Sequence, residues 1–393
     1  MDPTSPIAAA TAVLTAFILA SLASKFIKVP ETSGRFAPID GLRGYLSFLV
    51  FLHHSCIWYF YLHEGKWRPP SSNLYTHFGG SSVALFFMIT GFLFFSKVTQ
   101  QDKKVDWIQI YVSRILRLAP LYMATVGLIF VTVAVLSAGK LNEPLIMLLK
   151  NSLRWLLFTI PGTPDLNGVE RTRYIVAGVT WSLAYEWFFY ISLPAFALLA
   201  RARAPFNHLG LLFVFCYLLI LGEYFYLSFF GGVAASLLMG SQNFTKFAKS
   251  RIASVIISAC LILTVFLFST PFSIMPLVLL SITFILIAGG NSLFGIFTNK
   301  ASHVLGDMAY SIYLLHGLLL FVCFKFIVGF ESAATMTPFQ HWAVILCATP
   351  ALIVICFLSS TYIEKPPMRA AMGVSNWISS KFLTAAKVLR FRP

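Results

Sequence analysis

Long apolar runs separated by short polar or charged stretches make up most of this 393-residue chain. A helix that crosses a bilayer needs about 20 mostly apolar residues, because each residue adds about 1.5 Å along the helix axis. The pattern therefore predicts an all-α, polytopic integral membrane bundle with about eleven transmembrane helices. We place these helices near residues 7–27, 41–62, 79–96, 118–138, 178–200, 207–222, 223–240, 252–269, 272–289, 308–329 and 341–361.

Two amphipathic segments lie outside these eleven runs. The stretch 144–160 carries Lys150 and Arg154 four residues apart among apolar residues, which favours a helix lying on the membrane surface. The stretch after Pro367 combines Trp377 with several lysines and arginines, and we interpret it as a cytoplasmic interfacial helix. Both segments are therefore expected to contact the bilayer without crossing it.

The composition supports a membrane location and excludes an ordinary soluble domain, since 58% of residues are hydrophobic and only 11% are charged. A net charge of +15 would suggest nucleic acid as a partner of a soluble protein. Here most cations flank apolar runs, so membrane topology is the first explanation, a polyanionic substrate is the second, and no nucleic-acid partner is expected. The cysteines lie inside apolar runs without a CxxC pair, so neither a disulfide framework nor a metal site is expected.

The distribution of Lys and Arg predicts the orientation in the membrane. If the eleven runs alternate across the bilayer, roughly three-quarters of the 29 basic residues fall on one side. Since basic residues favour the cytoplasmic side, the N-terminus is expected outside and the C-terminus in the cytoplasm. Arg43, at the start of the second run, then lies at the cytoplasmic face.

The second run carries the strongest candidate site, because Arg43 and His54 are eleven positions apart on one predicted helix. At about 100° per residue, both side chains project from the same face, with an axial offset of about 16 Å. His54 therefore lies near the membrane midplane, where an ionisable side chain is costly and functional by default. An imidazole with a pKa near 6.5 suits a general base, although a bond between helices is the simpler alternative. His53 points about 80° away from this face.

Arg114 and Arg117 lie three apart on one helix face at the expected start of the fourth run. Two adjacent guanidinium groups suit phosphate binding, although anchoring at the cytoplasmic surface would explain them equally well. Glu186 lies inside the fifth run, where a carboxylate needs a partner. It either has a structural partner, positions a hydroxyl group or tunes a histidine.

Three further residues are candidates for supporting roles. His316 lies near the midplane in the tenth run, where a hydrogen bond to another helix is the simplest role. Glu364 ends the last run, and an ion pair with a cytoplasmic arginine is its most ordinary role. Asp40 opens the segment Asp40-Gly-Leu-Arg43 and stands one helical turn from that arginine.

Several of these stretches together resemble the acyltransferase 3 family of membrane O-acyltransferases. They occur in the family's order and comprise IDGLRG with its histidine, LFFMITGFLFF at 85–95, YVSRILRLAPLY at 111–122, WSLAYEWFFYISLP at 181–194, GDMAYSIYLLHG at 306–317 and YIEKP at 362–366. The chain departs from the family pattern at Ala84, at Trp187 after Glu186 and at Ala309. The family's Arg-x10-His and Arg-x-x-Arg motifs are intact.

The resemblance implies a fold, a reaction and a set of site residues. The membrane domain would span 36–369, with 1–35 as an additional N-terminal helix and linker and 370–393 as the cytoplasmic tail. The reaction would transfer an acyl group, usually acetyl, from cytoplasmic acetyl-CoA to a hydroxyl of a glycan or lipid-linked glycan. The essential motifs fall on Arg43, His54, Arg114 and Arg117, with acyl-CoA phosphates expected near the last two.

A bacterial inner membrane is the expected location, and a surface polysaccharide such as lipopolysaccharide O-antigen is the favoured acceptor. Among functions of a different class, a proton-coupled transporter or flippase would use the mid-membrane His and Glu as a proton relay and would need no CoA.

Overall fold

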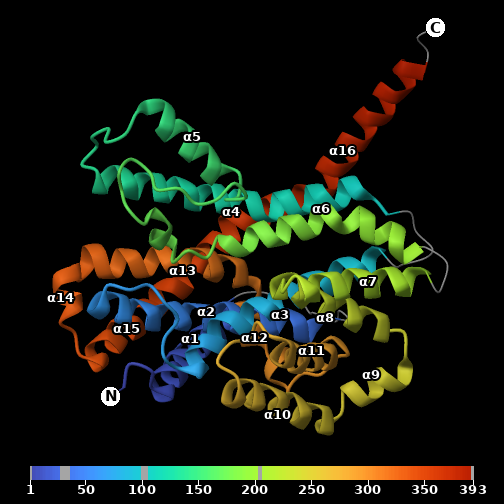
Figure 1. The fold of residues 1–393 in the computed structure, drawn as a ribbon, viewed down its shortest axis with the longest axis horizontal. Coiled ribbons are helices and arrows are strands. Elements are labelled where there is room, and N and C mark those ends of the chain that lie inside the picture. The colour runs from blue at the N-terminus through green and yellow to red at the C-terminus, as the bar shows by residue number, and fades with distance from the viewer. Residues whose placement is uncertain (1, 27–35, 99–104, 202–205, 391–393) are drawn as a thin grey trace.

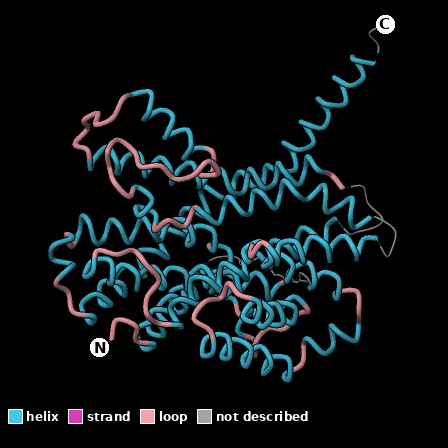
Figure 2. The backbone as a smooth tube through the Cα atoms, viewed as in Figure 1, coloured by secondary structure: helices cyan, strands magenta, loops and turns pink. Residues whose placement is uncertain are grey.

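The computed structural model describes residues 2–26, 36–98, 105–201 and 206–390, and these residues form helices and no β-strand (Figure 1; Figure 2). The predicted all-α fold class is confirmed. The α-helices are α1 (Pro6–Phe26), α2 (Ala37–Glu64), α3 (Asn73–Val98), α4 (Trp107–Leu136), α5 (Leu145–Leu156), α6 (Trp181–Arg201), α7 (Phe206–Ile220), α8 (Tyr224–Leu238), α9 (Gln242–Ala248), α10 (Arg251–Leu267), α11 (Ile274–Ala288), α12 (Lys300–Asp307), α13 (Ala309–Val322), α14 (Phe330–Ala334), α15 (Pro338–Ser359) and α16 (Lys365–Arg390). The 3₁₀ turns are η1 (Thr172–Val176) and η2 (Ile296–Thr298), and the π turns are η3 (Cys323–Ile327) and η4 (Ser360–Glu364).

Each of the eleven predicted membrane segments overlaps a helix, so the elements themselves were predicted correctly. Among the described residues, six helices are long and apolar enough to cross a bilayer, or seven if the bent pair α8 and α9 forms one span. Helices α10 and α11 and most of α7 are apolar but shorter. The chain is therefore a multi-pass membrane protein, while the count of eleven crossings stays a prediction.

Several helices begin earlier than the apolar runs that predicted them. Helix α4 begins at Trp107, because the carboxylate of Asp106 caps it by accepting a hydrogen bond from the Gln109 backbone N–H at 2.9 Å. The apolar run had placed Arg114 and Arg117 at the start of this helix. Because α4 begins at Trp107, both arginines lie well inside it. Hydropathy marks only the apolar part of a helix, so its polar first turns were missed.

The two predicted surface segments are helical, while their contact with the bilayer stays a prediction. Helix α5 exposes most of its large apolar side chains and buries Asn151 and Trp155. Helix α16 continues from α15 through the turn η4 and extends away from the bundle in Figure 1. The side chains after Lys381 and the proposed boundary at residue 35 lie outside the described residues.

Helix α2 lies at the centre of the bundle and packs against α3, α12 and α13. Glycines allow its backbone to touch the segment that contains η2 and α12. A Cβ atom on Gly41 would lie 1.9 Å from the Phe297 carbonyl oxygen, and one on Gly306 would lie 2.0 Å from the Asp40 carbonyl oxygen. Small residues permit such close contacts between membrane helices. This packing fixes the position of Arg43, which lies two residues after Gly41 on α2.

The first helix is docked on the bundle by a stripe of small residues. Ala8, Ala12, Ala16 and Ala20 recur every four residues and are all buried, where α1 packs against α12 and α15. At its beginning, the indole N–H of Trp342 donates to the carbonyl oxygen of Pro3 at 2.9 Å. The N-terminal helix is therefore an integral part of this bundle.

We expect Gly41→Ala to lower the stability of the purified protein, because its methyl group would overlap the Phe297 carbonyl. The expected cost is at least about 1–3 kcal/mol, typical of overpacking. Gly127→Ala on α4 is the matched control, since no atom lies within 4 Å of the added Cβ. Thermal unfolding in detergent, followed by tryptophan fluorescence, measures both, and equal midpoints would contradict the role of close packing.

Candidate functional site

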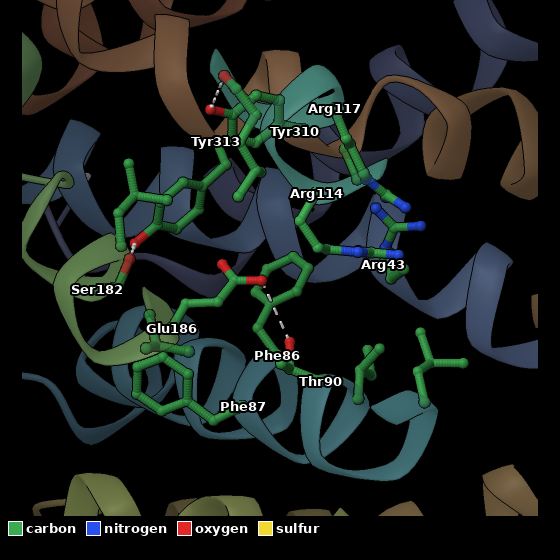
Figure 3. A pocket seen from close by; sticks show the side chains of 16 residues that line it. Arg43, Phe86, Phe87, Thr90, Arg114, Arg117, Ser182, Glu186, Tyr310 and Tyr313 are labelled. Atoms are coloured by element: carbon green, nitrogen blue, oxygen red, sulfur yellow. Dashed lines mark hydrogen bonds between the residues drawn. The ribbon is translucent and has the colours of Figure 1, made fainter. Parts of the chain in front are cut away.

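A cavity of about 100 Å³ lies among α2, α3, α4, α6 and α13 (Figure 3). Three arginines line it, namely Arg43 from α2 and Arg114 and Arg117 from α4, and their guanidinium groups gather on one side in Figure 3. We call this space the arginine cavity. The packing of α4 beside α2 thus brings together the two arginine motifs that lie far apart in the sequence.

The arginine cavity holds more positive than negative charge. Arg43 lies 3.8 Å from the half-exposed carboxylate of Asp40. Across the described part of the chain, no carboxylate comes within ion-pair distance of Arg114 or Arg117. The buried Nε of Arg114 has no hydrogen-bond acceptor there, and its guanidinium packs over the Phe94 ring at 4.7 Å. Since unpaired buried cations are costly, this arrangement favours an anionic ligand with several oxygens over surface anchoring.

A second cavity of about 130 Å³ meets the first one at Arg43, Arg117 and Tyr310, which line both. Glu364 also lines the second cavity, but its carboxylate accepts a hydrogen bond from the Ser311 hydroxyl. No arginine is within ion-pair distance of Glu364 in the described ranges, so the expected ion pair is wrong. Because η4 packs near α13, the Ser311 hydroxyl and not an arginine is the partner of Glu364.

Glu186 lies across the arginine cavity from the guanidinium groups (Figure 3). Its carboxylate accepts hydrogen bonds from the hydroxyl of Tyr190 and, at 3.5 Å, from that of Thr90. The structure thus gives Glu186 hydroxyl partners and no hydrogen bond to His54. Tyr190 is fully buried beside this carboxylate.

His54 and His316 form a hydrogen-bonded pair that joins α2 to α13. The Nε2 atom of His316 lies 3.1 Å from Nδ1 of His54. His316 is fully buried, whereas His54 is only partly buried. For each of the two histidines, the sequence indicated a hydrogen bond to another helix as the simplest role. The structure shows that the two histidines are each other's partners in that bond.

The surrounding carbonyl groups determine which nitrogen carries the proton in this pair. Nδ1 of His316 lies 2.9 Å from the carbonyl oxygen of Ile312, which can only accept, so this nitrogen is protonated. In the neutral ring, Nε2 of His316 is then an acceptor, and Nδ1 of His54 must donate to it. The carbonyl oxygen of Val50, 3.0 Å from the same Nδ1, favours the same assignment. The lone pair of His54 is consequently on Nε2, where it is available to accept a proton or attack a carbonyl group.

The neighbours of this pair connect it to the arginine cavity and to an aromatic stack. The ring of Tyr313, which lines the arginine cavity, has its centroid 6.3 Å from that of His316. On another side, the indole of Trp67 stacks on His54 with centroids 6.4 Å apart. His53 points elsewhere, since its Nδ1 lies 2.7 Å from the Tyr75 carbonyl oxygen. His54, and not His53, is therefore the one of the two adjacent histidines that pairs with His316.

Sequence reasoning missed four polar residues of the cavity, Thr90, Ser182, Tyr310 and Tyr313. The hydroxyls of Ser182 and Tyr313 lie 2.7 Å apart, and Tyr310 donates to the carbonyl oxygen of Leu118 at 2.9 Å. Their signal was present in the spacing, because Tyr310, Tyr313 and His316 recur every three residues and share a helix face. Across the described residues, no group of three or more His, Cys, Asp or Glu side chains is placed to hold a metal ion.

The family model for the acyltransferase 3 family, described as an acyltransferase domain, matches residues 36–361. This range covers most of the chain and includes both arginine motifs and both histidines. Comparisons with curated proteins and with solved structures give no match.

We expect the arginine cavity to bind a small polyanion even without any other substrate. Inorganic pyrophosphate, titrated calorimetrically into the protein in low-salt detergent solution, should bind at least about tenfold more weakly to Arg117→Gln, because charge-assisted hydrogen bonds are lost. Arg251→Gln, at the exposed beginning of α10, is the control. Equal weakening by the two variants would show that only overall charge matters.

Proposed function

The chain belongs to the acyltransferase 3 family, and from this premise we propose that it transfers an acetyl group from acetyl-CoA to a hydroxyl of a cell-surface glycan. The family membership supports acyl transfer over the transporter alternative. The observation that carries the proposal is the arginine cavity. It combines partly buried arginines that have no carboxylate partner with a wall at Tyr313, whose ring lies next to the His54–His316 pair.

Acyl-CoA provides the anionic groups that the arginine cavity lacks. Its phosphates would contact Arg43, Arg114 and Arg117, which together offer more donors than a single phosphate can use. Along α2, His54 lies about 16 Å farther than Arg43 and on the same helix face. The pantetheine arm would cover this distance and bring the thioester towards His54. In this arrangement Glu186, on the opposite wall, limits where the negative phosphates can lie.

The reaction then needs one proton acceptor. The lone pair on Nε2 of His54 takes the proton of the acceptor hydroxyl while the oxygen attacks the thioester carbonyl carbon. The tetrahedral adduct collapses by breaking the C–S bond, and the proton passes from His54 to the departing CoA thiolate. A covalent variant uses the same lone pair to attack the thioester first. Release of one equivalent of CoA before any acceptor is added would distinguish the covalent route.

The acceptor that we favour is a surface polysaccharide such as the O-antigen of lipopolysaccharide, modified at a bacterial inner membrane. The excess of basic residues at the Arg43 end of α2 supports a cytoplasmic position for the arginine cavity. The other end of α2 would face outwards, with the N-terminus outside and the C-terminus in the cytoplasm. Acetyl-CoA would therefore enter from the cytoplasm and the glycan from the opposite side.

We expect His54→Ala to insert and bind CoA normally but to lose glycan acetylation by about 10²-fold or more, the usual contribution of a general base. His63→Ala, exposed on the same helix, is the matched control. Mass spectrometry of base-labile acetyl esters on the cell's surface glycans measures transfer, and fluorescence size-exclusion chromatography verifies insertion. Full acetylation by the His54 variant would overturn the mechanism.

His316 is proposed as a positioning residue that acts through His54. His316→Leu removes the acceptor for the His54 Nδ1–H, whereas His316→Gln can offer its amide oxygen. We expect kcat to fall about 10- to 100-fold in the leucine variant and less in the glutamine variant, with the KM for acetyl-CoA unchanged in both. Steady-state kinetics on the purified variants provide this comparison. An equal loss in both would assign His316 to packing alone.

A further inference from the structure

Another cavity lies at the Glu64 end of α2, far from the arginine cavity. It has a volume of about 310 Å³, and its aromatic lining comprises Trp58, Tyr61, Tyr174, Phe321 and Phe330. We call it the aromatic cavity. Tyr61 lies about 27 Å along α2 from Arg43, so the two cavities are separated by nearly the thickness of a bilayer's hydrocarbon core.

Trp58 is one of the residues that border the aromatic cavity. It is fully buried, and its indole N–H has no acceptor in the parts of the chain that the structure describes. A buried donor without a partner costs about 1–3 kcal/mol. Because this N–H is shielded from the cavity space as well as from solvent, Trp58 contributes its ring to the lining and not a donor for a ligand.

Lys325 adds an unpaired cation to the same cavity. It lies in the π turn η3, at the end of an apolar helix, and its ammonium packs over the Phe330 ring at 4.5 Å. In the described segments no carboxylate is within ion-pair distance of it. π turns are frequent at functional sites, and a charged side chain in an apolar helix is rarely without a role. Glu170 and Arg171 contribute further polar groups from the facing loop.

That loop is held rigidly, as a binding wall requires. Asn167 accepts a hydrogen bond from the Asn142 backbone N–H at 2.8 Å and donates to the Lys140 carbonyl oxygen at 2.7 Å. Thr172 and Asp165 hydrogen-bond within the loop at 3.0 Å. Asn167 and Arg171 adopt positive φ values of 51° and 57°, a conformation that a non-glycine residue keeps only when its surroundings impose it.

The aromatic cavity is also linked to the reactive histidine. His54, Trp58 and Tyr61 are spaced by four and three residues, so they share one face of α2. Trp58 lies only about 6 Å beyond His54 along the axis. The indole of Trp67 stacks on His54 and also on Tyr174, whose ring centroid is 4.4 Å away. His54 itself does not line this cavity, and the ring of Trp67 connects it to Tyr174, which does. A ligand in the cavity would therefore approach His54 from the side opposite the arginine cavity.

We propose that the aromatic cavity binds the carbohydrate acceptor and directs one of its hydroxyl groups to His54, an inference that rests on the proposed acyl transfer. Sugars combine apolar C–H faces, which pack on aromatic rings, with many hydroxyl oxygens, which accept hydrogen bonds. The Lys325 ammonium donates to such oxygens, and Glu170 accepts from sugar hydroxyls. The cavity volume of about 310 Å³ lies at the lower end of the range for small-molecule sites.

Kinetics separates this binding site from the donor site. We expect Lys325→Met to raise the apparent KM for the cell's own surface glycan about tenfold or more, while the Kd for CoA stays within twofold of the wild type. Phe326→Leu, the exposed neighbour in the same turn, is the control. Unchanged acetylation by Lys325→Met would overturn the cavity assignment. Failure of the wild type to bind acetyl-CoA would instead overturn the proposed function.

Photocrosslinking in living cells tests the occupant directly. With p-benzoylphenylalanine in place of Tyr61, irradiation should give a covalent adduct whose sugar residues are identified by mass spectrometry after proteolysis. The same photoreactive residue in place of Tyr217, exposed on α7, should give no sugar adduct. An adduct with sugar at position 61 alone supports the proposal. An adduct with phospholipid alone, or the same sugar adduct at both positions, overturns it.

Discussion

Mutual repulsion among three guanidinium groups is the constraint on which this site depends. One cavity is lined by Arg43, Arg114 and Arg117. Without a bound anion, the positive charge of each guanidinium repels that of the other two. Two of them are held on a single long helix, α4, and the third on α2, which glycines hold tightly against its neighbours. The rigid packing around the cavity maintains an arrangement that the charges alone would disperse.

Helix α2 converts this charge cluster into a path across the protein. Along one face it presents an arginine, then a histidine, then two aromatic residues, and each faces a different environment. The helix therefore acts as a common axis on which two dissimilar substrates could be positioned from opposite ends. Between them, α13 contributes the second histidine and the tyrosines that border the arginine cavity.

Much of this arrangement could be predicted from the sequence, because it depends on local periodicity. The helical phase that places Arg43 and His54 on one face holds, since α2 is uninterrupted from Ala37 to Glu64. The bond between His54 and His316 could not be predicted as a pair, because it depends on how two helices distant in sequence pack. The partner of Glu364 was mistaken for the same reason, since Ser311 approaches it only in the folded bundle. The aromatic cavity was missed because it is assembled from four separate segments and a loop.

The protonation pattern of the histidine pair has a consequence for how such chemistry operates within a membrane. Both rings take their orientation from main-chain carbonyl groups of their own helices, so the reactive nitrogen is defined without a supporting carboxylate. A histidine–carboxylate pair would introduce a fixed negative charge at a depth where ions are poorly solvated. In the proposed mechanism the resting pair is electrically neutral, and a net charge exists only while the transferred proton resides on the ring. In that mechanism the helix backbone takes the place of the acidic residue that orients the base in many water-soluble enzymes.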